Sequence, residues 1–437
     1  MLVALSSPAA AGRPVQADPD VVVMSFTGDV AWPDGKNDFS EMRARGAGLF
    51  EQVRGLLERS DLAFANVECP ITARKTVATK TYPFRCQPET LEWILGTGIN
   101  LLSLANNHAR DAGAPGIADT LDLLEHTTSA ERPIFWAGVG RTPADARAPA
   151  IFTVPGKKLT VALFAVANAG GAGGGLVGGL WDKTLPERIR AARTQADVVI
   201  VSSHGGPEYI HTPTADFARR YRELIDAGAT LIIGHHPHVV QGVERHGDGF
   251  ILYSLGNFSF GSITSRHLAT GARMYSLIAR AKFRGGKLHR IELVPLYANN
   301  GSSWTLGERT VVARLGVPQL IAGPFAQYAL DELEAFSRAV PEAGPTALVR
   351  LGDRFYVDMD GEPVTDTRTA AILLGRQATD WAAVTALAAE PRAATPAERE
   401  AKSRAGTPWR AEPPAPTPRG RGKATAERGR RARRGTR

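Results

Sequence analysis

The stretch Ala229–His238 reads Ala-Thr-Leu-Ile-Ile-Gly-His-His-Pro-His, and the interpretation of the whole chain starts from it. Its first half is a short apolar, β-branched run that ends at Gly234, which is typical of a buried strand in a parallel sheet. Its second half places three imidazoles just beyond the carboxyl end of that strand, where open α/β sheets bind their ligands. In an extended segment stiffened by Pro237, His236 and His238 would face the same way and reach one site.

Imidazole is the most common neutral ligand for zinc, iron or manganese in proteins. The alternative is that these three histidines are ordinary residues of a surface loop. We favour the metal site, because a packed core has no use for three adjacent rings that each need polar partners.

The size and charge of the chain limit what it can be. Its 437 residues allow two or three domains, or one large α/β domain with additions, and 43% hydrophobic with 22% charged residues is ordinary for a globular protein. The formal net charge is +8, but residues 391–437, with 14 basic and four acidic residues, carry a net +10. The other 390 residues are therefore close to neutral, and we do not expect nucleic acid as a partner.

Composition divides the chain into four parts: a leader or truncated signal segment (1–20), a domain that carries the candidate chemistry (21–298), a C-terminal extension (299–390) and a basic tail (391–437) expected to be disordered. No stretch is long and apolar enough to span a bilayer. A signal segment would place the protein in the cell envelope or outside the cell, with membrane association left open. A complete N-terminus would leave it in the cytoplasm.

Cys69 and Cys86 fit no CxxC metal or redox motif, and two cysteines make no disulfide framework. A single bridge between them would form if the protein is exported, but separate thiols are the more common state of such a pair. We therefore favour separate thiols.

Apolar runs and helical spacing alternate along the chain, as expected of an α/β fold. Strands are predicted at 21–27, 62–69, 99–105, 133–138, 158–166, 196–202, 229–234 and 250–260, with hairpins at 275–296 and 347–359. Helices are predicted at 40–59, 88–95, 117–124, 185–194, 217–225, 325–338 and 370–389.

Five of the predicted strands lead into side chains that can bind a metal: Asp29; Asn66 and Glu68; Asn107 and His108; His204; His236 and His238. Each has an ordinary interpretation, such as a turn-forming aspartate or a helix-capping asparagine. Because the carboxyl ends of parallel strands open on one edge of a sheet, we expect these side chains to meet there. Such a mixed set of donors suits manganese, iron or zinc, as one ion or as two that share a carboxylate.

The string Asn106-Asn107-His108-Ala-Arg-Asp111 combines groups useful in hydrolysis. The amide oxygen of Asn107 can ligate a metal, His108 can donate a proton to a leaving group, and Asp111 lies one helical turn on, where it can orient His108. An asparagine-rich helix cap explains one of these residues but not the whole string.

Two further features have open roles. Glu208, in His204-Gly-Gly-Pro-Glu-Tyr, is a candidate base, ligand or substrate contact, or a carboxylate in the first turn of a helix. The basic loop at 72–82 and the residues after it could bind an anionic substrate through Lys75, Lys80 and Arg85, although a solvated loop is the simpler interpretation.

Six motifs, in order, resemble the CapA family of poly-γ-glutamate capsule synthesis proteins, which are related to the calcineurin-like metallophosphoesterases. They are Gly28-Asp29-Val30, Asn66–Pro70, Ala105–Gly113, His204–Tyr209, Gly234–His238 and Tyr253–Phe258, within residues 21–296. The resemblance implies an α/β fold in the form of a four-layer α/β/β/α sandwich. It also implies metal ligands at Asp29, Glu68, Asn107, His204, His236 and His238, with His108 as proton donor.

The sequence differs from the family pattern at two places and has one histidine that the pattern does not require. Asp29 is followed by Val30 and Ala31 where related phosphoesterases have Asp-x-His, which leaves the number of metals open. Gly205 stands where the family often has tryptophan. The resemblance does not require His235 to be a histidine.

The resemblance implies a metal-dependent hydrolase or transferase that acts on a phosphate ester or γ-glutamyl amide, with an anionic capsule polymer as partner. The alternative is a non-catalytic, polymer-binding accessory subunit of a membrane capsule synthase. A third hypothesis is a nucleic-acid enzyme that uses the basic tail.

Overall fold

The structure is a computed structural model that describes residues 18–32, 40–168, 175–261, 269–270, 272–298 and 302–360, all of them within one compact unit. Most of the predicted leader, the helix predicted at 370–389 and the basic tail lie outside the described residues.

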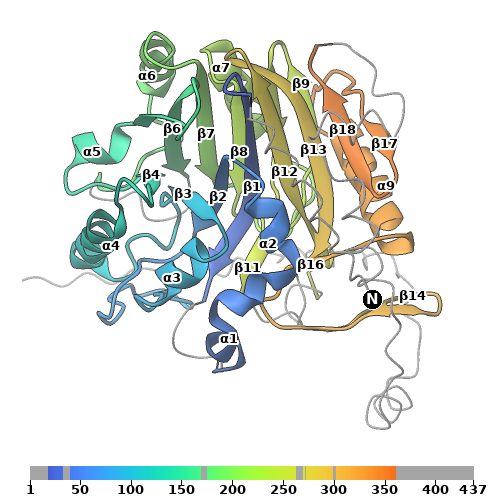
Figure 1. Cartoon of the computed structure of the whole chain (residues 1–437), viewed down its shortest axis with the longest axis horizontal. Helices are drawn as coiled ribbons and strands as arrows, with labels where there is room; N and C mark the ends of the chain where they lie inside the picture. The colour runs from blue at the N-terminus through green and yellow to red at the C-terminus, as the bar shows by residue number, and fades with distance from the viewer. Residues whose placement is uncertain are drawn as a thin grey trace, which may run out of the picture. The chain divides into compact units, whose positions relative to one another are not determined.

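The larger sheet has ten strands among the described residues (Figure 1). In spatial order they are β17 (Val349–Leu351), β18 (Arg354–Asp358), β13 (Lys287–Tyr297), β12 (Tyr275–Arg284), β1 (Val21–Ala31), β2 (Leu62–Val67), β3 (Ile99–Ser103) and β4 (Phe135–Ala137), with β11 (Asn257–Phe260) on β1 and β16 (Gln319–Leu320) on β13. Strands β1 to β4 are parallel to one another, and β12 and β13 form the predicted antiparallel hairpin.

The smaller sheet has six strands in the described part of the chain: β5 (Ala150–Thr153), β6 (Thr160–Ala167), β7 (Val198–His204), β8 (Leu231–His235), β10 (Gly249–Leu252) and β9 (Val243–His246). The four central strands are parallel, and β5 and β9 pair antiparallel at the two edges. A separate hairpin joins β14 (Trp304–Leu306) to β15 (Arg309–Val311). Strands β5, β9, β14, β15 and β16 were not predicted, because each is too short to show a hydrophobic period.

Helices connect most of the parallel strands, and further helices lie between other strands. They are α1 (Ser40–Arg45), the 3-10 helix η1 (Gly46–Phe50), α2 (Glu51–Leu57), α3 (Thr90–Leu95), α4 (Gly113–Thr127), α5 (Pro143–Arg147), α6 (Leu185–Ala192), α7 (Ala215–Asp226) and α9 (Pro324–Arg338). The single helix predicted at 40–59 is wrong in one respect. Gly46 takes a left-handed φ of 50°, and η1 separates α1 from α2 there.

Buried strand residues show how the sheets stack. In β7, Val198 and Ile200 join the large core shared with the ten-stranded sheet, whereas Val199 and Val201 face the other way and pack with α6 and α7. A strand covered on both faces needs this unbroken apolar run. Helices α2, α3 and α4 pack into the large core, and Figure 1 shows α2 and α3 in front of the larger sheet. The predicted α/β class is confirmed, while the four-layer count stays a prediction.

The stretch predicted as one strand and turn at 250–260 is two strands in different sheets. β10 ends at Leu252 in the smaller sheet, and β11 begins at Asn257 in the larger one. Gly256, with φ 74°, lies on the short crossing between them. The crossing ties the two sheets together beside the motif residues.

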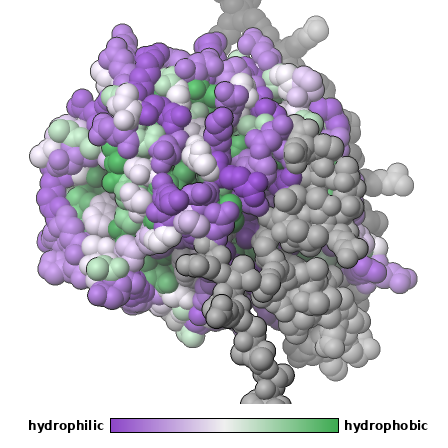
Figure 2. All heavy atoms as spheres, turned by 45° about the horizontal axis from the view of Figure 1, so that its top comes forward, coloured by the Kyte–Doolittle hydropathy of each residue, from purple (hydrophilic) through white to green (hydrophobic). Residues whose placement is uncertain are grey.

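The described part of the predicted C-terminal extension completes the larger sheet. β18 pairs with β13, β16 pairs with the end of β13, and α9 contributes buried residues to the large core. Figure 2 shows a face on which hydrophilic side chains surround separate groups of apolar ones. Among the described helices, none has the length and apolar character needed to cross a membrane.

Cys69 and Cys86 form a disulfide, with their Cα atoms 5.8 Å apart. The expectation of separate thiols is therefore wrong. Cys69 directly follows Glu68 at the end of β2, and the backbones at Ile71 and Cys86 form a β-bridge that brings the two cysteines together.

Candidate metal centre

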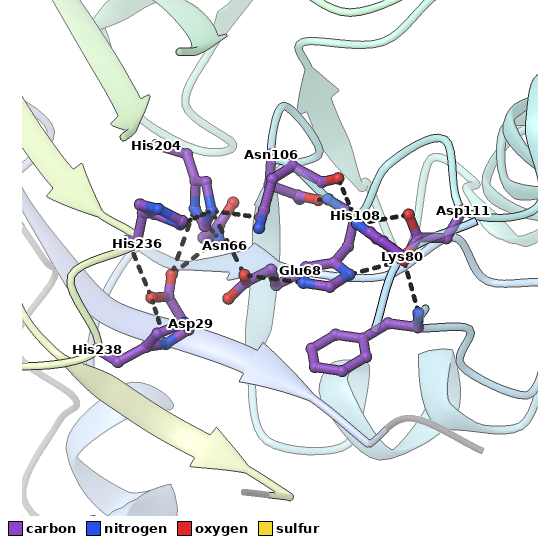
Figure 3. A network of polar contacts seen from close by, with 12 residues as sticks. Asp29, Asn66, Glu68, Lys80, Asn106, His108, Asp111, His204, His236 and His238 are labelled. Carbon is purple, nitrogen blue, oxygen red and sulfur yellow. Dashed lines mark hydrogen bonds and ion pairs between the residues drawn. The ribbon is translucent and has the colours of Figure 1, made fainter. Parts of the chain in front are cut away.

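The carboxyl ends of five strands lead into one cluster of polar side chains (Figure 3). Strands β1, β2 and β3 belong to the larger sheet, and β7 and β8 belong to the smaller one. The expectation that the five ends share the edge of a single sheet is therefore wrong. The cluster lies where matching edges of two stacked sheets come together, and within each sheet the strands that bear ligands are parallel.

Two glycines, one on a strand of each sheet, let these strands lie close to the crossing segment at residues 253–256. A Cβ on Gly28 would lie 1.8 Å from the carbonyl oxygen of Gly256, and one on Gly234 would lie 1.8 Å from that of Tyr253. No larger residue fits at either position without moving a strand. The two residues that follow these glycines, Asp29 and His235, are thereby brought into contact, with Oδ1 3.2 Å from Nδ1.

Asp29 is fully buried and surrounded by protein donors. Its Oδ1 accepts a hydrogen bond from Nδ2 of Asn66 at 2.8 Å. Its Oδ2 accepts one from the backbone N–H of His236 at 3.2 Å and lies 3.7 Å from Nδ1 of His238. Burial alone would raise the pKa of Asp29, but the contact with His235 and the neighbouring imidazoles lower it overall. Asp29 is therefore held as a carboxylate by the protein itself.

Glu68 is buried as completely as Asp29 but lacks comparable donors. Neither of its carboxylate oxygens makes a hydrogen bond within the described residues. Nε2 of His204 lies 3.4 Å from Oε1, and Nε2 of His108 lies 3.8 Å from the same oxygen. Burial raises the pKa of Glu68 well above its ordinary value. A buried carboxylate with unsatisfied oxygens needs an explanation, and a bound cation is the simplest one.

Three imidazoles surround Glu68. Nε2 of His204 lies 3.1 Å from Nδ1 of His236, and the ring centroids of His236 and His238 are 5.9 Å apart. Burial lowers the pKa of His204 to about 3 and also lowers that of His236, so both rings are neutral at pH 7. For His238 burial acts in the same direction, but the charge of Glu68 raises its pKa overall.

The turn that carries His236 and His238 is left-handed rather than extended. Their φ angles are 92° and 58°, on either side of Pro237. Such strain persists only where the surroundings hold it, and it gathers at functional sites. Here the His236 N–H donates to Asp29, and the Pro237 carbonyl accepts from the N–H of Tyr209 at 2.8 Å. The two histidines converge as expected, but the predicted extended backbone is wrong.

Three overlapping groups of ligand atoms, each with all its atoms within 4.8 Å of one another, could hold a metal ion: Glu68, His204 and His236; Asp29, Glu68 and His238; Glu208, His236 and His238. Glu68 belongs to the first two groups and is the carboxylate able to bridge two ions. Asn107 lies beside them, with Oδ1 2.9 Å from Nε2 of His204. This donor set, with the open oxygens of Glu68 and the neutral imidazoles of His204 and His236, fits manganese, iron or zinc.

His108 lies beside the ligand groups, in the turn before α4. Its Nδ1 lies 2.7 Å from Oδ2 of Asp111, so this nitrogen carries the proton and Nε2 is directed toward Glu68. Burial lowers the pKa of His108 to about 4, although Asp111 opposes the shift. Asn106 accepts the N–H of His108 within this turn. The helix-cap interpretation is wrong, because the N-cap residue of α4 is Ala112.

Glu208 is exposed, and its carboxylate lies close enough to His236 and His238 to complete the third ligand group. Its interpretation as a first-turn helical carboxylate is wrong, because α7 begins only at Ala215. The structure thus brings every predicted site residue to one place, and the roles of these residues stay predictions.

Sequence analysis missed the residues that hold the site in place. Asn257 accepts from Nδ1 of His238 at 2.9 Å. The ring of Phe84 stacks on His108, with centroids 3.7 Å apart. Lys80 is not part of a merely solvated loop, because its Nζ lies 2.7 Å from Oδ1 of Asp111. Asn257 lies within the Tyr253–Phe258 motif, to which the sequence analysis assigned no role in the site, and no local pattern marks Phe84.

Comparison with known proteins gives a family match. Residues 23–262 match the family described as "Bacterial capsule synthesis protein PGA_cap".

Individual relatives carry related names. The chain is 31% identical over 251 residues to "PGA biosynthesis protein CapA" of Bacillus subtilis, covering 55% of this chain and 64% of that protein. It is 30% identical over 268 residues to "Capsule biosynthesis protein CapA" of Bacillus anthracis, covering 58% and 62%. A "Probable polyglutamine synthesis accessory protein" of Mycobacterium tuberculosis is 27% identical over 215 residues, covering 45% and 55%. The matched region spans less than two-thirds of each of these relatives.

Proposed function

Because the chain belongs to the PGA_cap family of bacterial capsule synthesis proteins, we propose that it is a metal-dependent hydrolase in the synthesis or export of a poly-γ-glutamate capsule. The resemblance drawn from the six motifs is confirmed at the level of the family. The bond cleaved would be a phosphate ester or a γ-glutamyl amide. One observation carries the proposal: Glu68, whose two buried oxygens make no hydrogen bond to any residue that the structure describes, is shared by overlapping groups of ligand atoms.

The residues that would hold the metal are Asp29, Glu68, Asn107, His204, His236 and His238. A divalent cation at such a site supplies Lewis-acid polarisation of the scissile group and a water acidic enough to attack near neutral pH. The protein's contribution is rigidity, because Asp29 and the strained turn fix the imidazoles before any ligand arrives.

His108 would move the proton of the reaction. Asp111 holds the Nδ1 proton, so that the unprotonated Nε2, on the side of Glu68, would take a proton from the attacking water and then pass that proton to the leaving group. Glu208, exposed beside two of the imidazoles, would contact the substrate or its attacking water first.

The Cys69–Cys86 disulfide supports a location in the cell envelope or outside the cell, because such bonds persist in oxidising compartments. An anionic capsule polymer is the expected partner there, and a membrane capsule synthase is the expected complex.

The test uses the purified full chain. We expect elemental analysis to find manganese, iron or zinc, and a chelator to abolish hydrolysis of p-nitrophenyl phosphate or γ-glutamyl p-nitroanilide until the metal is restored. Glu68→Gln should lose metal, and His108→Gln should keep metal but lose turnover by at least about 100-fold. His246→Asn is the control, because His246 pairs with Asp226 outside the site. A metal-free, folded chain without turnover would contradict the proposal.

A second candidate is a non-catalytic accessory subunit that binds capsule polymer. The name of the Mycobacterium tuberculosis relative, an accessory protein, favours it. Polymer binding that survives both Glu68→Gln and chelation, in a chain with no turnover, would support this candidate over the hydrolase.

A further inference from the structure

Residues 70–86 form a loop between β2 and α3 whose two ends are fastened together. The Cys69–Cys86 disulfide closes it, and a β-bridge joins Ile71 to Cys86. The N–H of Thr72 donates to the Cys86 carbonyl, and the N–H of Cys86 donates to the Pro70 carbonyl, both at 2.9 Å. The ends of the loop are therefore fixed next to Glu68.

The middle of this loop has little burial to hold it. Residues 73–75 are exposed, as are 77, 79, 81 and 82, and the side chain of Val77 is 68% exposed. A loop of this kind owes its conformation to its closed ends and to a few polar contacts.

Most of those polar contacts go to the segment that carries His108. The N–H of Val77 donates to the carbonyl of Asp111 at 2.7 Å. Nζ of Lys80 lies 2.7 Å from Oδ1 of Asp111 and donates to the carbonyl of Asn107 at 2.8 Å (Figure 3). The N–H of Phe84 donates to Oδ2 of Asp111 at 2.6 Å.

Phe84 also fixes the imidazole itself. Its ring lies parallel to that of His108, with an angle of 9° between the planes and 3.7 Å between the centroids. His108 is thus held on one face by Phe84 and at Nδ1 by Asp111, while Nε2 is directed toward Glu68. The closed loop thus supplies the ring that stacks on His108 and three groups that contact Asp111: the N–H groups of Val77 and Phe84 and Nζ of Lys80.

We propose that the loop at 70–86 is a positioning device for His108, that Lys80 and Phe84 are its positioning residues, and that it acts fully only while the Cys69–Cys86 disulfide is intact. The kinetic consequence rests on the proposed function, because it assumes that His108 moves a proton. A dithiol would release the loop by passing two electrons and two protons to the disulfide, leaving two cysteine thiols and its own disulfide. The site would then be assembled best in an oxidising compartment.

The kinetic test compares variants of the full, metal-loaded chain. We expect Lys80→Met to lower kcat about 10–100-fold with KM and metal content changed less than about 2-fold, because small misplacement of a catalytic group has this effect. Lys80→Arg should restore most of kcat, and Lys183→Met, at an exposed lysine outside the loop, should match wild type. Cys86→Ser and dithiol treatment should each reproduce the loss. Full activity after reduction, or metal loss in parallel with kcat, would overturn the proposal.

A spectroscopic test does not depend on turnover. In a chain labelled with 15N-histidine, the Nδ1–H signal of His108, assigned by its absence in His108→Gln, should be protected from solvent in the oxidised protein. It should broaden or shift after reduction and in Lys80→Met. An unchanged signal would overturn the positioning role. If wild type turned over no substrate but the signal responded to reduction, the hydrolase proposal would fail and the positioning role would stand.

Discussion

Glu68 and Glu292 are two buried carboxylates at strands of the larger sheet, and they differ in what surrounds them. Glu292, on β13, accepts from Nη1 of Arg280 at 2.8 Å and also contacts Arg354 and the hydroxyl of Tyr356. Glu68, at the end of β2, has no hydrogen-bond partner among the described residues. Burial would raise the pKa of either group, yet the arginines lower that of Glu292, whereas that of Glu68 is raised.

The difference distinguishes a carboxylate that stabilises the fold from one that is available to bind a ligand. A buried charge is tolerated when it is paired and hydrogen-bonded, and Glu292 meets that condition with cations supplied by the protein. Glu68 meets it only if a cation comes from outside. We therefore interpret the cluster around Glu292 as part of the framework and the cluster around Glu68 as a binding site.

The largest expected effect is on the free energy of unfolding, when glutamine replaces Glu292 or Glu68. Glu292→Gln should lower the free energy of unfolding by about 3 kcal/mol, because it leaves two buried guanidinium groups without their anion. Glu68→Gln in the metal-free chain should change it by less than about 1 kcal/mol, since the amide has the shape of the carboxyl group and no hydrogen bond to a described residue is lost. Urea denaturation monitored by circular dichroism measures both. Equal destabilisation by the two variants would show that Glu68 stabilises the fold as much as Glu292 does.

The second effect is stabilisation by added metal. At a cation concentration 100 times the dissociation constant, wild type should gain about 2.7 kcal/mol, because the ion binds only the folded state. Glu292→Gln should gain the same amount relative to its own baseline, and Glu68→Gln should gain almost none. The measurement is denaturation with and without manganese or zinc. A comparable gain in Glu68→Gln would place the ion elsewhere.

A smaller effect is expected at His235, which contacts Asp29 and stacks on Phe64 with centroids 5.7 Å apart. His235→Phe keeps the stacking but removes the contact to Asp29. We expect it to weaken metal binding about 10–100-fold, as loss of a group that orients a ligand does. A competition titration with a coloured chelator measures this, with His246→Phe as control. Unchanged affinity would show that Asn66 and the His236 N–H suffice to hold Asp29.

The smallest expected effect is the change in the free energy of unfolding at acidic pH. Because the pKa of Glu292 is lowered from its ordinary value of 4.5, its pairing stabilises the fold above that pH and is lost as the pH falls through the lowered value. The stability difference between wild type and Glu292→Gln should therefore be constant from pH 7 to about 5 and shrink below about 4.5. Denaturation curves at several pH values test this, and a difference that widens in acid would contradict it.

Much of the site could be predicted from sequence because its signals are local. A strand that ends in Gly28-Asp29, and another that ends in Gly234 before three histidines, each show their chemistry within a few residues. The spacing of His108 and Asp111 likewise predicted their contact, which the structure shows at 2.7 Å.

What could not be predicted depends on contacts between distant residues. Membership of a sheet is set by long-range pairing, so residues 250–260 gave no sign that the chain changes sheets at Gly256. The left-handed turn at His236 depends on an acceptor at Asp29, 207 residues away. Phe84 lies in a loop without periodicity, and it stacks on His108, a residue of a different segment.

The central claim is that Glu68 is a ligand in need of a cation. Its most direct test is the anomalous scattering from crystals of the full chain grown with manganese or zinc. We expect an anomalous peak within bonding distance of Glu68, shared with His204 and His236 or with Asp29 and His238. Crystals saturated with metal that show no peak there, and protein hydrogen bonds to both Glu68 oxygens instead, would contradict the account.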